Sequence, residues 1–146
     1  MREFGFKFER GRIYATVPVP PSANMYWRKR MIVSRGTSRS ITYVSNEGIA
    51  YRKLICQLFM VSRIPGFKNL VEFEGVFFPP DRRRRDNDNL RKCLFDSLTH
   101  AGVWPDDSNV TYDPITKADP CKNDGHMKIR LTPTTKLKEV PLWAMQ

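Results

Sequence analysis

The sequence predicts a single small domain of the α/β (α+β) class, with a mixed β-sheet and two main helices packed on it. Its 146 residues are about the usual size of one domain. Segments with strand-like alternation and segments with helical spacing follow one another in the order strand, helix, strand, helix, strand, strand. This mixture is typical of helices that pack on a sheet. We expect the domain to span residues 1–132 and a carboxyl-terminal tail to span residues 133–146.

The amino-terminal segment FGFKFERGRIYATVPVPPS alternates apolar and polar residues, which predicts one or two strands. Pro18, Pro20 and Pro21 then end the sheet, because proline cannot donate a ladder hydrogen bond. Residues 22–42 are rich in Arg, Lys, Ser and aromatic residues but have little periodicity. We therefore expect them to form an exposed basic loop.

Two later segments have helical spacing. Ser45 is a suitable N-cap for a helix that ends before Pro65, and a second helix is expected from about Asn89 to Ala101, with Gly102 as its stop. The apolar stripe of the first helix is expected to be Ile49, Ala50, Leu54, Leu58 and Val61. The stripe of the second is expected to be Leu90, Leu94, Leu98 and Ala101.

The remaining strands are predicted from alternation and from turn residues. LVEFEGVFF, residues 70–78, alternates along its length and is expected to end at the following two prolines. NVTYDPITKA and HMKIRLTPT predict further strands, separated by the turn-rich segment DPCKNDG.

The charge of the chain favours a polyanionic partner. Lys and Arg number 25 against 15 Asp and Glu, which gives a net charge of +10. A field of this sign attracts nucleic acid or an acidic surface, although a merely soluble basic protein also fits the charge alone. The three cysteines have no zinc-site spacing, and no run of about 18 apolar residues or signal peptide is present. We expect a soluble cytoplasmic protein without a membrane partner.

Carboxylates on either side of the second predicted helix suggest a metal site. Asp86 and Asp88 are two residues apart, so on an extended segment both side chains point to one side and can face one ion. Asn89 is expected to cap the helix, and Lys92 lies on the adjoining helical face. After the helix, the chain can bring Asp106 or Asp107 alongside the first pair.

Such a cluster of oxygen ligands suits Mg²⁺, with Mn²⁺ as a substitute. A cation of this kind polarises a phosphoryl oxygen and activates water, and a nearby lysine stabilises the extra negative charge of the transition state.

These aspartates have two other interpretations. In the first, they are caps and turn residues paired with the arginine run 82–85, which is the commoner role for an isolated Asp-x-Asp-Asn. The lysine one turn into the helix and the second Asp pair beyond it make the metal site the better interpretation. In the second, the segment is a calcium loop, but Arg91 stands where Gly is needed and Ser97 where Glu is needed. No phosphate-binding loop is present, so no nucleotide cofactor is expected.

The stretch PDRRRRDNDNLRKCLFDSLTHAGVWPDDSNV closely resembles the core signature of the RusA-type Holliday-junction resolvases, which are small Mg²⁺-dependent endonucleases of phages, prophages and bacteria. PVPPSANMYWR and VSNEGIAYR also resemble the family pattern, so the similarity spans most of residues 13–132. The resemblance implies that Asp86, Asp88 and Asp107 are the metal-binding catalytic carboxylates and that Lys92 is the catalytic lysine. It also implies supporting roles for Asn89, Asp96 and Asp106.

The family resemblance further implies a mixed α/β fold and a homodimer that makes paired, symmetric nicks in four-way DNA during recombination, repair or phage DNA processing. The residues expected to bind DNA are Arg82, Arg83, Arg84, Arg85, Arg28, Lys29 and Arg30. Some arginines of the 82–85 run are expected to hold phosphates while others pair with the catalytic acids. Tyr26 and Trp27 are candidates to stack at the junction centre, although burial is the commoner role of such aromatics.

Two other functions remain open from the sequence. One is a basic DNA-binding protein without catalytic activity, for which the charge is sufficient. The other is a nuclease with the same chemistry that acts on flaps, forks or RNA.

Overall fold

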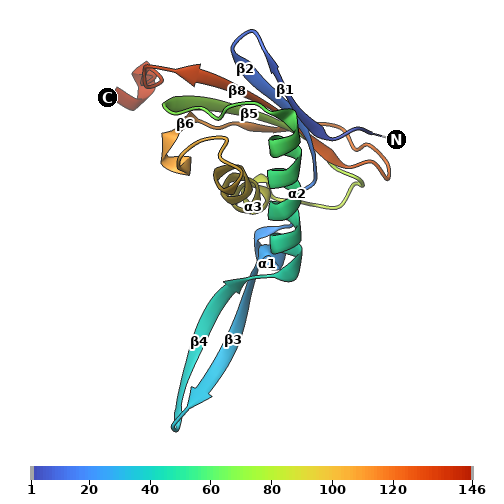
Figure 1. The fold of residues 1–146 in the computed structure, drawn as a ribbon, viewed down its shortest axis with the longest axis vertical. Coiled ribbons are helices and arrows are strands. Elements are labelled where there is room, and N and C mark those ends of the chain that lie inside the picture. Colours follow the sequence, from blue (N-terminus) through green and yellow to red (C-terminus); the bar gives the residue numbers. More distant parts are fainter. Residues whose placement is uncertain (1, 146) are drawn as a thin grey trace.

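A computed structural model describes residues 2–145 and has one mixed sheet with two long helices on one face, as the sequence predicts (Figure 1). The strands of the main sheet are β1 (Gly5–Glu9), β2 (Arg12–Pro18), β5 (Leu70–Phe78), β6 (Val110–Tyr112), β7 (Ile115–Lys117) and β8 (His126–Thr134). Their order is β1-β2-β8-β5-β6, and β7 also pairs with β5. The pairs β1·β2, β2·β8 and β8·β5 are antiparallel, whereas β6 and β7 run parallel to β5.

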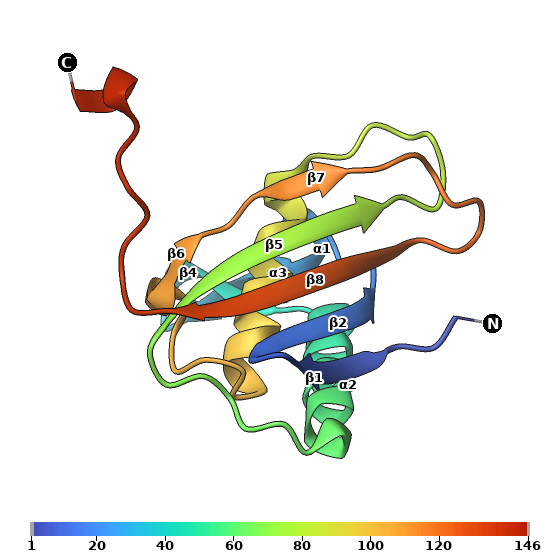
Figure 2. The same cartoon turned by 90° about the horizontal axis from the view of Figure 1, so that it is seen from above.

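The two long helices are α2 (Asn46–Ser62) and α3 (Asn87–His100). Ser45 caps α2 as predicted, because its hydroxyl accepts a hydrogen bond from the Gly48 amide at 3.1 Å. Gly102, with φ of 78°, follows the last turn of α3 and ends that helix as predicted. Figure 2 shows both helices beneath the sheet, with α3 under β5 and β8.

The buried face of α2 differs from the predicted stripe. Its buried side chains are Tyr51, Ile55 and Phe59, whereas Ile49 and Val61 of the predicted stripe are exposed. The helix is apolar on more than one side, so spacing alone leaves two candidate faces. The face with the aromatic rings packs on the sheet and α3, because burying the larger side chains removes more apolar area from water.

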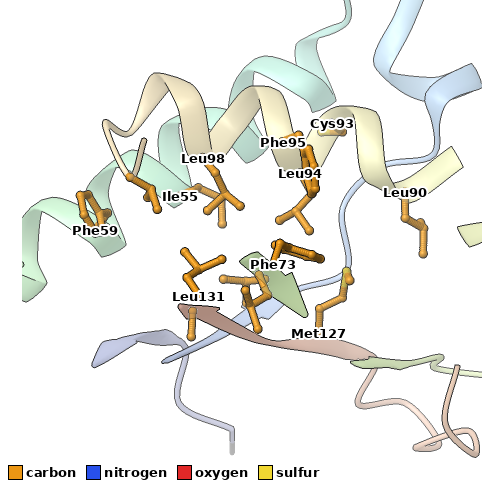
Figure 3. Packing of buried hydrophobic residues seen from close by; sticks show 14 of the residues in the cluster. Ile55, Phe59, Phe73, Leu90, Cys93, Leu94, Phe95, Leu98, Met127 and Leu131 are labelled. Atoms are coloured by element: carbon orange, nitrogen blue, oxygen red, sulfur yellow. The ribbon is translucent and has the colours of Figure 1, made fainter. Parts of the chain in front are cut away.

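The core lies between the sheet and these helices. Figure 3 shows Ile55 from α2 and Leu94 and Leu98 from α3 facing Phe73 of β5 and Leu131 of β8. All five of these side chains are fully buried. The alternation of β5 predicted from the sequence is confirmed, because Val71, Phe73, Gly75 and Phe77 point to the core.

Residues 22–42 are not the loop that the sequence predicts. They form the short helix α1 (Ala23–Tyr26) and most of a two-stranded hairpin, β3 (Trp27–Ser34) and β4 (Thr37–Val44), which extends away from the body of the molecule (Figure 1). We call residues 27–44 the arm. Its strands are exposed on both faces, so the sequence lacks the apolar alternation by which strands are normally recognised.

The chain ends in a segment that follows β8. Residues 135–145 include the short 3₁₀ helix η2 (Leu142–Met145), and the side chain of Trp143 in it is 80% exposed. Lys138 attaches the start of this segment to the sheet through an ion pair with Glu72 at 3.1 Å. Among the helices of residues 2–145, none is long and apolar enough to cross a membrane.

Candidate active site

The start of α3 carries the first two predicted metal ligands, in a local geometry that differs from the prediction. Asp86, not Asn89, is the N-cap, and its carboxylate accepts a hydrogen bond from the Asp88 amide at 3.1 Å. Asp88 already lies in the first helical turn, so the two side chains do not alternate as on an extended strand. Both carboxylates nevertheless lie at the positive end of the helix dipole, where negative charge is stabilised.

These acids open into a hollow on the surface. The hollow has a volume of about 720 Å³, and its lining residues are Arg84, Arg85, Asp86, Asn87, Asp88, Asn89 and Lys117. The Asp88 side chain is 81% exposed, and its ion-pair partner is Arg91 at 3.8 Å. The hollow therefore combines accessible oxygen ligands with cations on its rim.

Two arginines of the run 82–85 beside the hollow pair with Asp81, not with the predicted metal ligands. Arg85 donates to Asp81 at 2.9 Å, and the Arg83 amide donates to the same carboxylate at 2.9 Å. The hydrogen bonds from Arg85, then that from Arg83, hold the pKa of Asp81 well below its usual range. Arg82 and Arg84 have no ion-pair partner among residues 2–145. The expectation that arginines of this run pair with Asp86 or Asp88 is wrong.

Lys92 lies on the helical stripe between Asp88 and Asp96, and its ammonium contacts Asp96 at 3.1 Å. The other oxygen of Asp96 accepts a hydrogen bond from the Tyr26 hydroxyl at 3.1 Å, and that hydroxyl accepts one from Arg52 at 2.6 Å. Tyr26 is fully buried, and this burial raises the pKa of its hydroxyl, so it remains a donor. Lys92 is thus fixed from three elements, α1, α2 and α3, but does not line the hollow.

Asp106 and Asp107 are not among the residues that line the hollow. Asp106 caps the 3₁₀ helix η1 (Asp107–Asn109), and hydrogen bonds from Ser108 lower the pKa of its carboxyl group. Figure 2 shows η1 beside the start of β6, whereas α3 starts near β7.

The positions at which β6 and β7 pair with β5 indicate how far η1 lies from the start of α3. Val110, just after η1, lies opposite Val71, whereas the Asn87 side chain at the start of α3 donates to Ile115, which lies opposite Gly75. Four residues along β5 correspond to about 13 Å. Within residues 2–145, Asp107 therefore does not join Asp86 and Asp88 in a common ligand cluster.

Cys121, Asp124 and His126 do form such a cluster, with ligand atoms within 4.8 Å of one another. However, Asp124 already binds the guanidinium of Arg2 at 2.7 Å, and the His126 ring bonds the Asp124 carbonyl at 2.8 Å. The negative charge of Asp124 is thus balanced by Arg2 within the chain.

A model of the family described as endodeoxyribonuclease RusA matches residues 17–132 of this chain. This match covers the hollow, the arm and both long helices.

The chain belongs to the RusA family.

Several curated members of the RusA family resemble the chain over most of their length. A crossover junction endodeoxyribonuclease of Enterobacteria phage 82 is 37% identical over 120 residues, which are 82% of this chain and 92% of the relative. The enzyme of the same name from Escherichia coli K12 is 37% identical over 118 residues, 80% of this chain and 91% of the relative. That from Shigella sonnei is 36% identical over the same length. Strand β1 and the segment after residue 132 lie outside the match to the RusA model.

The sequence does not predict some of the residues that line or support the hollow. Lys117 reaches the hollow from β7 and donates to the Arg85 carbonyl at 2.6 Å, and Asn87 joins the start of α3 to β7. The sequence also does not indicate that Asp81 is the partner of Arg83 and Arg85. Lys117 stands about 30 positions from the motif in a three-residue strand, so no local pattern marks it.

Proposed function

We propose that the protein is a crossover junction endodeoxyribonuclease that resolves Holliday junctions, which are four-way DNA, by paired symmetric nicks. Its setting would be recombination, repair or phage DNA processing. The observation that carries this proposal is the hollow at the start of α3, where exposed Asp86 and Asp88 meet Arg84 and Lys117. Membership of the RusA family and the names of its curated members support the same chemistry and substrate.

The residues of the hollow fit a hard divalent cation. Asp86, Asp88 and the side-chain carbonyl of Asn89 offer oxygen ligands, and the carboxylate of Asp88 is open to solvent. Such ligands suit Mg²⁺, with Mn²⁺ as a substitute. When bound, the metal supplies polarisation of the phosphoryl oxygen and an activated water.

The third carboxylate of the site is Asp107, with Asp106 in support. Because the fold holds η1 and the start of α3 at different levels of β5, a single chain leaves the ligand set incomplete. We infer that the active form is a homodimer in which a second copy brings its Asp107 to Asp86 and Asp88. A twofold dimer also matches the two equivalent strands that must be cut in a four-way junction.

Lys92 is the proposed catalytic cation. Its ammonium lies on the same helical stripe as Asp88, one turn away, so a change of side-chain rotamer moves it from Asp96 toward a phosphate bound at the hollow. There it stabilises the negative charge that develops as water attacks phosphorus.

The basic residues around the hollow position the DNA. Arg82 and Arg84 have no ion-pair partner within residues 2–145 and are available to phosphates, while Arg83 and Arg85 are ordered by Asp81. Arg28 and Arg30 on the arm extend the contact along the DNA. Contacts of these residues with phosphates are sequence-independent and weaken with salt.

The test of this proposal is a cleavage assay on an end-labelled four-way junction and on a linear duplex of matching sequence, each with Mg²⁺ and with EDTA. We expect paired symmetric nicks on the junction only, and only with Mg²⁺. Asp86→Asn should abolish the nicks but preserve binding, because a repulsive carboxylate is removed. Tight binding without nicks in several junction sequences, with Mn²⁺ also tried, would leave a DNA-binding protein without catalytic activity. Preferential cutting of flaps, forks or RNA would keep the chemistry but replace the substrate.

A further inference from the structure

The arm carries a concentration of positive charge that the body of the protein does not neutralise. Residues 27–44 contain five basic residues and no acidic residue. The basic residues are Arg28, Lys29, Arg30, Arg35 and Arg39. None of them has an ion-pair partner within residues 2–145. Five uncompensated cations on a projecting ribbon favour a polyanionic ligand.

The arm is a regular ribbon, so its register assigns each side chain to a face. Arg35 and Gly36 form the two-residue turn, with φ of 49° and 74°, as a tight hairpin requires. Cross-strand partners share a face, and successive residues alternate between faces. Arg28 pairs with Tyr43, Arg30 with Ile41 and Ile32 with Arg39.

It follows that one face holds three of the four basic residues of the strands. We call this the arginine face; its members are Arg28, Arg30, Ile32, Ser34, Thr37, Arg39, Ile41 and Tyr43. The opposite face holds Trp27, Lys29, Met31 and Val33, opposite Val44, Thr42, Ser40 and Ser38. Its only charged member is Lys29. Positive charge is therefore concentrated on one side of the ribbon.

The dimensions of the arginine face suit duplex DNA. Its successive rows of side chains are about 6.6 Å apart, which is close to twice the roughly 3.4 Å axial spacing of phosphates along one strand. An eight-residue strand extends about 26 Å, the length of roughly eight base pairs. A two-stranded ribbon also fits the width of the major groove.

We propose that the arm lies along one duplex arm of the branched substrate, away from the cleaved bond, with its arginine face toward the phosphates. The inference rests on the proposed function, because it takes branched DNA as the substrate. It differs from the expectation drawn from sequence in one respect: Lys29 faces away from the contact. The arm then adds affinity and orientation without entering the chemistry.

The experiment compares two single variants that are neighbours in the chain and remove the same charge. Arg30→Gln is on the arginine face and Lys29→Gln is on the opposite one. We expect Arg30→Gln to weaken equilibrium junction binding several-fold more than Lys29→Gln, measured in Ca²⁺ to prevent cleavage. Equal weakening by the two variants would overturn the assignment of faces.

A triple variant, Arg28→Gln with Arg30→Gln and Arg39→Gln, measures the whole interaction of the arginine face with DNA. We expect the slope of log affinity against log salt to become shallower by about 3, at roughly 0.9 for each phosphate that is no longer neutralised. The charge-matched control replaces Arg10, Arg12 and Arg63, which are exposed on the body, with Gln and should leave most of the slope intact.

The outcomes separate this inference from the proposed function. If the wild-type protein neither binds nor cuts junctions, the proposed function fails and the arm proposal fails with it. If the wild type cuts junctions but the triple variant keeps the wild-type slope, the arm proposal alone is overturned. A triple variant that binds DNA normally but no longer forms dimers would assign the arm to the subunit interface and would also overturn the proposal.

Discussion

The hydroxyl of Tyr26 connects α1, α2 and α3, and its removal is the sharpest test of how the site is held. Tyr26→Phe keeps the buried ring but deletes the group that donates to Asp96 at 3.1 Å and accepts from Arg52 at 2.6 Å. Hydrogen bonds to charged groups contribute about 1.5–3 kcal/mol each, and partial exposure of Asp96 reduces this. We therefore expect the free energy of unfolding to fall by about 2 kcal/mol.

The matched control is Tyr51→Phe. Tyr51 is also buried, but its hydroxyl makes one hydrogen bond to a neutral acceptor, the Pro18 carbonyl, at 2.9 Å. We expect this variant to be destabilised by about 1 kcal/mol.

Urea unfolding followed by tryptophan fluorescence measures both variants. With a slope of about 2 kcal/mol per molar urea, the midpoint should fall by about 1 M for Tyr26→Phe and by about half as much for Tyr51→Phe. If Tyr26→Phe is no more destabilising than Tyr51→Phe, the charged network does not hold the three helices together, and the reasoning is refuted.

Three further variants or treatments test the packing and the site. Gly48→Ala should lower the free energy of unfolding by about 1–3 kcal/mol, because the new Cβ would lie 2.5 Å from the Tyr26 ring. This clash should outweigh the higher helix propensity of alanine. An unchanged urea midpoint would contradict this expectation. Burial raises the pKa of Cys93 to about 12, so its thiol should resist iodoacetamide in the native protein at pH 8. In urea, all three cysteines should react. Fast labelling of Cys93 in the native protein, located by mass spectrometry, would count against its buried position. Mixing inactive Asp86→Asn and Asp107→Asn chains should restore nicking to about a quarter of the wild-type level. The reason is that half of the random dimers are mixed, and each mixed dimer contains one complete site out of two. A mixture as inactive as its components would mean that Asp107 acts within its own chain.

The elements that the sequence predicts well are those whose signals are local. The alternation in residues 70–78 gives β5, Ser45 gives the start of α2, and Gly102 gives the end of α3. In each case the preference is encoded by the residue itself or by neighbours within one turn, so no distant contact is needed to read it.

The elements that were missed depend on what surrounds a segment. The sequence predicts a loop for the arm because strand prediction relies on one buried face, and this ribbon has none. The predicted stripe of α2 differs from the buried one because the helix is apolar on two sides, and only the position of the sheet decides that Tyr51, Ile55 and Phe59 face inward. Similarly, Asp86 rather than Asn89 begins α3, because several consecutive Asp and Asn residues are all good caps and leave the boundary open.

The sequence by itself determined the chemistry of this protein: a run of arginines, an Asp-x-Asp-Asn motif, a lysine one turn later and a second aspartate pair, with the family that they indicate. Only the tertiary structure decided how these groups are distributed. It directs Lys92 to Asp96, assigns Arg85 to Asp81, and pairs Val110, just after Asp107, with β5 at a position about 13 Å from the pairing position of Ile115, which the start of α3 contacts. The physical reason is that residue type fixes what a side chain can bind, whereas the distance between two side chains far apart in the chain is fixed by sheet register and helix packing, which arise from contacts across the whole fold.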